Sequence, residues 1–137
     1  MATLVDTNVL IDLFHTGSAF EDWSLLAIAK VRRQGDVLIN PLIYAEMAAG
    51  FATVGALDAA LSPTSFLRED LPWEAAHAAG LAFLQYRRSG GDKRSPLPDF
   101  YIGAHALVRG HALLTRDPAR YKTYFPMIRL ITPETHP

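Results

Sequence analysis

The stretch "TLVDTNVLIDLF", residues 3–14, places an acid inside an otherwise apolar segment. The segment Thr3–Asp6 is typical of a short buried strand, and apolar residues resume at helical spacing over Val9–Phe14. Asn8 is expected to cap that helix with its side-chain oxygen. An acid on the surface needs no explanation, but a carboxylate at the boundary of the core is costly unless something compensates its charge.

The alternation of short apolar runs with amphipathic segments continues along the chain. Gly35 and Gly110 end two expected helices, and Pro41 begins another. Residues 89–98, "SGGDKRSPLP", predict a loop. The other expected strands are Val37–Ile39, Phe66–Leu67, Ala112–Thr115 and Ile128–Ile131, and the other expected helices are Glu21–Arg33, Pro41 to about Ala49, Thr53–Leu61, Trp73–Arg88, Asp99–Arg109 and a single turn at Pro118–Tyr121.

Strands that alternate with helices indicate an α/β fold with a short parallel sheet and helices on both faces. The 137 residues suggest one domain spanning 1–137. The chain has no cysteine, which excludes disulfides, thiolate metal sites and a cysteine nucleophile, and fits a cytoplasmic protein. No apolar run approaches the roughly 20 residues of a membrane helix. With a net charge of −1, a uniformly basic surface for nucleic acid is not expected.

Two acids follow apolar runs, and two others lie on helices. In parallel α/β sheets, ligands bind beyond the carboxyl ends of the strands, where Asp6 and Asp117 are expected. Glu46 shares a helix face with apolar or small residues, and Asp99 does the same on a later helix. Each has a plain structural explanation, since aspartates often cap helices or turns and Asp99 favours a helix dipole. Glu46, in mid-helix on an apolar line, is hardest to explain that way.

Four converging carboxylates would repel one another unless a cation neutralises them. Mg²⁺ and Mn²⁺ prefer oxygen ligands, and such a site can activate water against a phosphodiester. The set Asp6, Glu46, Asp99 and Asp117 therefore indicates a divalent metal centre. The five histidines show no pairing pattern and are expected to be surface or packing residues.

A basic segment precedes Asp99 around the glycine-rich loop. Its side chains could contact phosphate beside the metal centre, or they could be solvated charges at a helix end. Arg116, between Thr115 and Asp117, could also reach a substrate. The candidate substrate-binding residues are Arg87, Arg88, Lys93, Arg94 and Arg116.

Taken together, four segments resemble the PIN-domain ribonucleases, and within them the VapC-type toxins of toxin–antitoxin pairs. They are "VDTNVLIDLF", "NPLIYAEMAAGF", "LPDFYIGAHAL" and "LLTRDPARYKTYFP", in the order of the family and spanning almost the whole chain. The resemblance implies a Rossmann-like PIN-domain sandwich and an endoribonuclease that uses Mg²⁺ or Mn²⁺. It assigns Asp6, Glu46, Asp99 and Asp117 to the metal centre, with Asn8 and Thr115 in supporting places. Many relatives carry a further acid after the position of Asp117, but "RDPARY" has none, so a four-acid site is expected.

The resemblance also implies a homodimer and a cognate VapB-type antitoxin that blocks the site. Two related alternatives remain, a metal-dependent phosphoesterase or nuclease of another class and a non-catalytic PIN binding module. A signalling receiver domain would need adjacent acids after its first strand and a lysine after a late one. Thr7-Asn8 and Thr115-Arg116 stand at those places instead.

Overall fold

The computed structural model describes residues 1–15 and 17–137, and in them a single five-stranded parallel sheet. Its strand order is β3-β2-β1-β4-β5. The α/β class with a short parallel sheet is therefore confirmed. The strands are β1 (Thr3–Val5), β2 (Val37–Ile39), β3 (Leu67–Arg68), β4 (Ala112–Leu114) and β5 (Leu130–Ile131).

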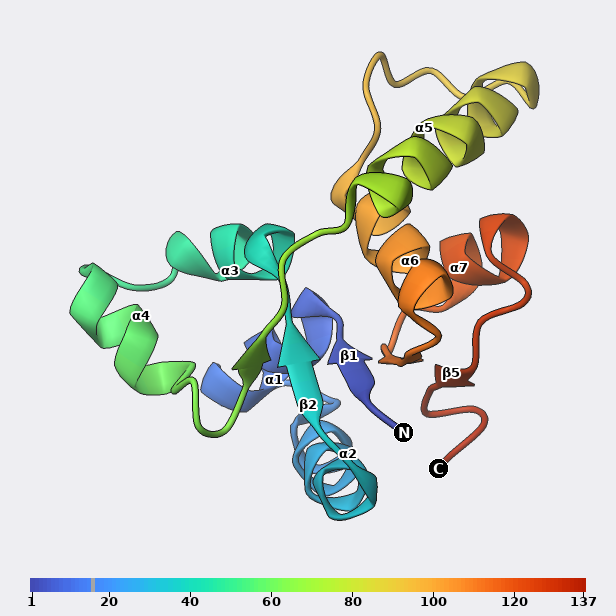
Figure 1. Ribbon diagram of the computed structural model, residues 1–137. Helices are drawn as coiled ribbons and strands as arrows, with labels where there is room; N and C mark the ends of the chain where they lie inside the picture. Colours follow the sequence, from blue (N-terminus) through green and yellow to red (C-terminus); the bar gives the residue numbers. More distant parts are fainter. Residues whose placement is uncertain (16) are drawn as a thin grey trace.

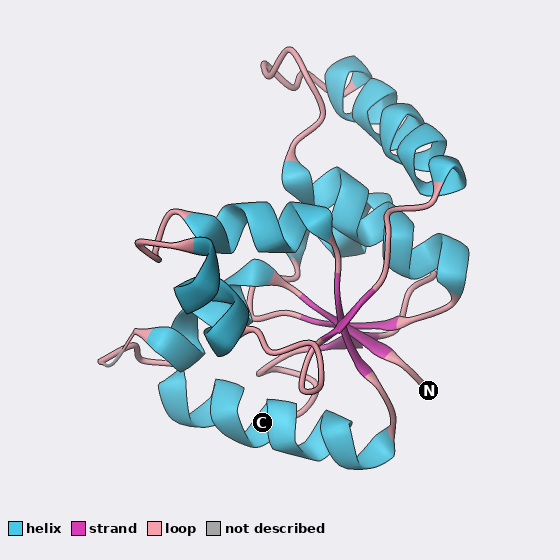
Figure 2. Cartoon of the chain, turned by 60° about the vertical axis from the view of Figure 1, so that its left-hand side comes forward, coloured by secondary structure: helices cyan, strands magenta, loops and turns pink. Residues whose placement is uncertain are grey.

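Helices connect the strands and cover the sheet. Where the chain is described, they are α1 (Thr7–Phe14), α2 (Glu21–Gln34), α3 (Pro41–Ala48), α4 (Val54–Ala60), α5 (Trp73–Arg88), α6 (Pro98–Arg109) and α7 (Ala119–Tyr124). Figure 1 shows their arrangement, and Figure 2 shows helices on both sides of the twisted sheet. None of the helices in residues 1–15 and 17–137 is long and apolar enough to span a bilayer.

The strand order reverses between β1 and β4. From β1 the chain moves outward to β2 and β3, then crosses back to β4 and β5 on the other side of β1. Because parallel crossovers are right-handed, this reversal sends the later helices to the opposite face of the sheet. The carboxyl ends of β1 and β4 thus flank a topological switch point, the place where such sheets bind ligands.

The middle of the sheet is fully buried. Leu4 of β1 lies opposite Leu38 of β2 and Leu113 of β4, and these three side chains are 0%, 6% and 0% exposed. Burying a leucine contributes about 1.5–3 kcal/mol to folding, so this row fixes the register of the central strands. The backbone N–H of Asp6 then donates to the carbonyl of Leu114 at 2.9 Å, which carries the ladder one residue beyond β1.

Several boundaries differ from the expected ones. Helix α1 starts at Thr7 with Asp6 as its N-cap, so the expectation that Asn8 caps it is wrong. Strand β3 starts at Leu67 because the N–H of Phe66 bonds the carbonyl of Ser62 in a turn.

Near the C-terminus, the expected helical turn is instead a six-residue helix, α7. Strand β5 starts only at Leu130. Ile128 belongs to a turn, in which its N–H donates to the carbonyl of Phe125. The expected loop at 89–98 is present up to the start of α6.

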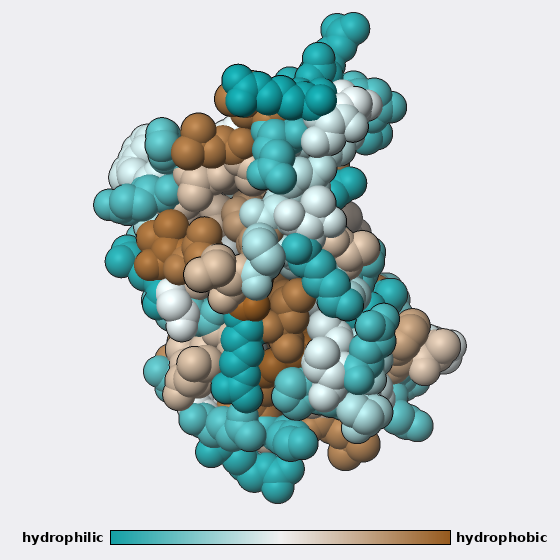
Figure 3. All heavy atoms as spheres, turned by 90° about the vertical axis from the view of Figure 1, so that its right-hand side faces the viewer, coloured by the Kyte–Doolittle hydropathy of each residue, from teal (hydrophilic) through white to brown (hydrophobic). Residues whose placement is uncertain are grey.

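Helix α5 projects from the body of the molecule and packs mainly on α6 (Figure 1). The tip formed by the end of α5 and the following loop is hydrophilic on the face seen in Figure 3, whereas hydrophobic patches lie below it. The four basic side chains of this tip, Arg87, Arg88, Lys93 and Arg94, are all exposed.

Candidate metal centre

Asp6 lies at the switch point with both carboxylate oxygens engaged. Oδ1 accepts the N–H of Thr7 at 2.8 Å, the capping bond of α1. Oδ2 accepts hydroxyl hydrogens from Thr115 and Tyr121, both at 2.9 Å, and an amide hydrogen from Asn8 at 3.3 Å. The aspartate is therefore a helix cap and also a carboxylate held in one orientation by its neighbours.

The charge of Asp6 is only partly compensated by these bonds. Burial, with a contribution from the negative charge of Asp99, raises the pKa of Asp6 to about 6, although the hydrogen bonds from Thr115 and Tyr121 oppose the rise. A carboxyl group with three donors on one oxygen would ordinarily have a low pKa. The raised value shows that the cost of burying the carboxylate outweighs the stabilisation from these donors.

Glu46 lies on α3 and is exposed, contrary to expectation. Of the residues inferred to share its face, Ile43 is buried and Leu42 is partly buried, but Ala49 and Gly50 are exposed, and the other buried side chain of α3 is Met47. The prediction failed because α3 packs mainly against α1 and α6 and buries only one narrow stripe, Ile43 and Met47. Its carboxylate nevertheless turns toward Asp6, since its Oε1 accepts the hydroxyl of Thr7 at 2.7 Å.

Asp99 opens the first turn of α6, and Asp117 follows β4. The side chain of Asp99 is 43% exposed, so it lies at the surface of the hollow and not inside the core. Burial raises the pKa of Asp99, and the nearby charge of Asp117 adds to the rise. The structure thus brings all four predicted acids to the rim of one hollow of roughly 180 Å³, lined by Asp6, Thr7, Asn8, Ile11, Glu46, Asp99 and Asp117.

Arg120 and Tyr121 of α7 were missed in the sequence. The guanidinium of Arg120 lies 3.7 Å from the carboxylate of Asp99 and over the rings of Tyr86 and Phe100. Asp99 therefore has a basic partner within the site. The two residues lie three and four positions after Asp117, and the first turn of α7 brings them to Asp99 and Asp6.

The expected supporting residues connect the two sides of the switch point. Asn8 donates to the hydroxyl of Thr115 at 3.2 Å and accepts the N–H of Arg116 at 3.2 Å. The same hydroxyl accepts the N–H of Asp117 at 3.1 Å. These bonds hold the start of α1 against the turn after β4.

Arg116 is held on the far side of that turn. Its Nε donates to Asp12 at 2.8 Å, and its guanidinium lies over the ring of Phe20. The Asp12 carboxylate is 1% exposed and also accepts the hydroxyls of Ser18 and Ser24. Asp12 was missed because its partner lies 104 residues away in the sequence.

The comparison with protein families identifies the chain. The PIN domain model matches residues 3–126. The chain belongs to the PIN domain family. No curated protein matched it.

Solved structures resemble this PIN domain over nearly its whole length. A chain of VapBC2 from Rickettsia felis, bound to a promoter DNA fragment, has 15% identity and a TM-score of 0.74, with 96% of this chain and 98% of that chain covered. VapBC-1 from nontypeable Haemophilus influenzae has 18% identity and a TM-score of 0.72, with 96% of this chain and 98% of that chain covered. VapC20 from Mycobacterium tuberculosis, a sarcin–ricin loop cleaving toxin, has 15% identity and a TM-score of 0.59, with 88% of this chain and 94% of that chain covered. At these identities the likeness establishes the fold.

The oxygen-rich hollow of this PIN domain fits a hard divalent cation. Asp6 and Asp99 have raised pKa values, and each is raised in part by another carboxylate of the set. A cation would relieve that repulsion, and carboxylate oxygens are ligands that Mg²⁺ and Mn²⁺ prefer. Arg120 pairs with Asp99 at 3.7 Å, and among the described residues no salt bridge joins it to Asp6 or Glu46.

A second cluster of potential ligands in this PIN domain was also missed in the sequence. Donor atoms of Glu69, His105 and His111 all lie within 4.8 Å of one another, close enough to hold a metal ion. Both histidine Nε2 atoms lie 2.7 Å from the same Oε1 of Glu69. The expectation that the histidines show no pairing is wrong for His105 and His111.

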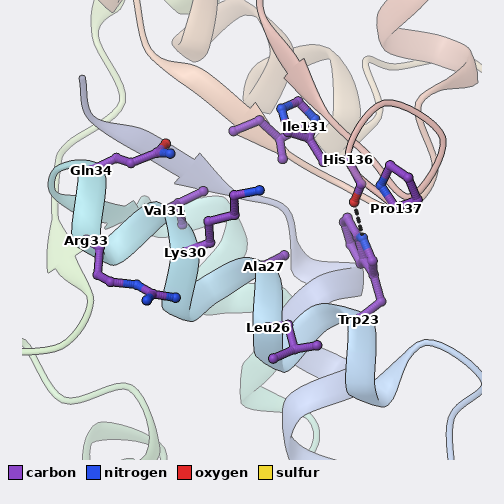
Figure 4. A pocket seen from close by; sticks show the side chains of 10 residues that line it. All are labelled: Trp23, Leu26, Ala27, Lys30, Val31, Arg33, Gln34, Ile131, His136 and Pro137. Atoms are coloured by element: carbon purple, nitrogen blue, oxygen red, sulfur yellow. Dashed lines mark hydrogen bonds between the residues drawn. The ribbon is translucent and has the colours of Figure 1, made fainter.

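A larger hollow, of about 300 Å³, lies between α2 and the C-terminal segment of the PIN domain. Figure 4 shows the side chains that line it, with the indole N–H of Trp23 donating to the carbonyl of His136 at 2.7 Å. No aspartate or glutamate is among its ten lining residues. It therefore offers neither the charge nor the ligands of the acidic hollow.

Proposed function

We propose that this PIN domain is a Mg²⁺- or Mn²⁺-dependent endoribonuclease toxin of the VapC type, inhibited by a cognate VapB-type antitoxin. One observation carries the proposal: Asp6, Glu46, Asp99 and Asp117 line a single hollow at the switch point of the sheet. The structural likeness to VapBC proteins, one of them a toxin that cleaves the sarcin–ricin loop, supports it.

The four acids would hold the cation. Glu46 uses one oxygen for Thr7, and Asp6 uses Oδ2 for three donors, so Glu46 Oε2 and Asp6 Oδ1 are the oxygens with capacity left. When bound, the ion would polarise the scissile phosphate and lower the pKa of a water molecule. Asp99 is partly exposed and Asp117 is exposed, so both can reach a water molecule and would orient it for in-line attack.

Two residues prepare the site without touching the phosphate. Burial and the charges of Asp6 and Asp99 hold the pKa of Tyr121 well above its ordinary value, so its phenol remains a hydrogen-bond donor. Thr115 donates to the same carboxylate oxygen. Together they keep Asp6 in a single rotamer, as such supporting bonds do in metal sites.

RNA would approach from the side of the α5–α6 loop. Arg87, Arg88, Lys93 and Arg94 are exposed there and precede Asp99 by 12 residues or fewer. The Arg87 guanidinium also bonds the carbonyl of Lys93 at 2.6 Å and so stiffens the loop. Arg116 is a weaker candidate because Asp12 occupies its Nε, whereas Arg120 lies beside Asp99 and is better placed for phosphate.

The antitoxin would bind the exposed apolar part of α3, α4 and their connection. Val54 is 70% exposed, and Phe51 packs edge-on against Phe14 at 6.0 Å between ring centroids. An amphipathic helix laid in such a groove would cover it. A second copy of the chain is the other expected partner, and a homodimer in the cytoplasm belongs to the same proposal.

Growth and RNA integrity test this function. Expression of the chain alone should stop growth and yield RNA fragments, and co-expression of a short upstream reading frame should relieve both. Asp99→Asn should abolish toxicity, whereas Asp22→Asn, an exposed acid in the first turn of α2, should leave it intact. Unimpaired growth with a well-folded wild-type chain would favour a non-catalytic PIN module, and cleavage of DNA alone would favour another nuclease class.

A further inference from the structure

The cluster of Glu69, His105 and His111 lies outside the acidic hollow. Glu69 follows β3, His105 is on α6 and His111 precedes β4. The side chain of His105 is 0% exposed, and those of His111 and Glu69 are 12% and 31% exposed. Two imidazoles and a carboxylate are a common ligand set for zinc, so the cluster is a second candidate metal site.

Asn40 decides which nitrogen of His105 carries its proton. The Asn40 Oδ1 accepts the N–H of Ile43 at 3.0 Å as the N-cap of α3, so its amide nitrogen points the other way. That nitrogen lies 3.0 Å from Nδ1 of His105. Because an amide NH₂ only donates, Nδ1 must accept and the hydrogen of the neutral ring must sit on Nε2.

With its hydrogen on Nε2, His105 donates to Glu69 at 2.7 Å and has no lone pair there for a metal. Moving the hydrogen to Nδ1 would set two donors 3.0 Å apart in a buried site. Turning the Asn40 amide would remove the contact but would break the helix cap. Burial, aided by the charges of His111 and Arg109, also lowers the pKa of His105, so the ring stays neutral.

We propose that Asn40 locks His105 in the Nε2–H form, so that Glu69, His105 and His111 act as a hydrogen-bonded clamp and not as a metal site. The clamp ties the segment after β3 to α6 and to the start of β4, and through Asn40 to α3. The proposal also implies a latent zinc site, one substitution away. It does not rest on the nuclease function.

Asn40→Asp should release the lock. An aspartate caps a helix as well as asparagine does, and its second oxygen would accept a hydrogen from Nδ1 of His105. The one N–H hydrogen of the neutral ring would then sit on Nδ1, and the Nε2 lone pair would face Glu69 and His111. A carboxylate behind a histidine is the arrangement that supports zinc ligands in proteins.

Cobalt(II) absorption measures this change in the full-length chain. Four-coordinate Co²⁺ with imidazole ligands absorbs visible light strongly, whereas Co²⁺ among carboxylates and water absorbs weakly. The wild type and Gln34→Glu, which adds the same charge at an exposed position of α2, should show only weak absorption. Asn40→Asp should gain the strong bands, Zn²⁺ should displace them, and Asn40→Asp/His111→Ala should lose them.

Strong bands in the wild type that disappear in His111→Ala would overturn the proposal, and so would a folded Asn40→Asp variant without them. Histidine ¹⁵N spectra of the wild type give a test that needs no variant to bind metal. Nε2 of His105, assigned with His105→Phe, should carry the hydrogen and Nδ1 should not. A hydrogen on Nδ1 would contradict the lock.

Discussion

The hydroxyl of Tyr121 donates a hydrogen bond of 2.9 Å to Oδ2 of Asp6, across 115 residues of sequence. Thr115 and Asn8 also donate to Oδ2, so that oxygen is saturated, whereas Oδ1 accepts only the N–H of Thr7. The contact makes Tyr121 a positioning residue for the proposed metal centre.

Tyr121→Phe should therefore weaken Mn²⁺ binding by about 10-fold or more, the usual cost of losing a bond behind a metal ligand. The fold should survive, because Asp6 keeps its other donors. Calorimetric Mn²⁺ titrations would measure the change, with Tyr124→Phe, another tyrosine of α7, as the matched control. Equal affinities in the wild type and both variants would show that the hydroxyl only fills space.

Removing charge from Asp6 should stabilise the metal-free protein at neutral pH. Its pKa is about 6 in the folded state against an ordinary 3.8, so the folded state binds more protons between these values. Stability contributed by protonated Asp6 is thus lost as the pH rises through this window, at a cost of up to about 3 kcal/mol at pH 7. Asp6→Asn should flatten that dependence.

Urea unfolding in chelator from pH 4 to pH 7 would test this. Asp6→Asn should be at least as stable as the wild type at pH 7, and Asp36→Asn, an exposed acid before β2, should behave like the wild type. Added Mn²⁺ should stabilise the wild type and not Asp6→Asn. A large loss of stability in Asp6→Asn at pH 7 would mean that the charge of Asp6 is structural.

The sequence predicted the fold well because its signals are local. Buried strands are short apolar runs, and Gly35, Pro41 and Gly110 mark helix ends by their own backbone preferences. The acids at the ends of β1 and β4 could also be predicted, because parallel strands bring their carboxyl ends to one edge.

The remaining features depend on contacts that the sequence does not display. Glu46 was assigned to a buried face, but which face of α3 is buried depends on how the helix packs against α1 and α6. The bonds of Tyr121 to Asp6 and of Arg116 to Asp12 join residues more than 100 positions apart. His105 and Glu69 are only 36 positions apart, but they meet only after α5 and α6 have folded back over the sheet.

The basic tip before α6 should contribute to RNA affinity. Replacing Arg87 and Arg88 with alanine should weaken RNA binding. The slope of log affinity against log salt concentration should fall in magnitude by roughly one to two, about one for each lost phosphate contact. Binding would be measured at several salt concentrations in an Asp99→Asn background loaded with Mn²⁺. Arg109→Ala/Arg129→Ala removes the same charge from exposed positions at the opposite edge of the sheet and should leave the slope unchanged. Equal slopes for both double variants would place the RNA path elsewhere.

The antitoxin surface can be tested at Val54. Val54→Arg puts a charge on a side chain that is 70% exposed on α4, so it should weaken antitoxin binding while leaving RNA cleavage and stability unchanged. Met127→Arg, at a residue 85% exposed between α7 and β5, is the control and should bind normally. If Val54→Arg binds as tightly as the wild type, the groove at α3 and α4 is not the antitoxin site.

Metal-dependent RNA cleavage by the purified chain tests the central claim most directly. Cleavage of a structured RNA would be followed while Mn²⁺ is added to chelator-treated protein, for the wild type, Asp99→Asn and the exposed-acid control Asp22→Asn. The four-acid centre predicts no cleavage in excess chelator, saturable recovery with Mn²⁺ in the wild type and control, and none in Asp99→Asn. Full cleavage in excess chelator, or by Asp99→Asn, would contradict it.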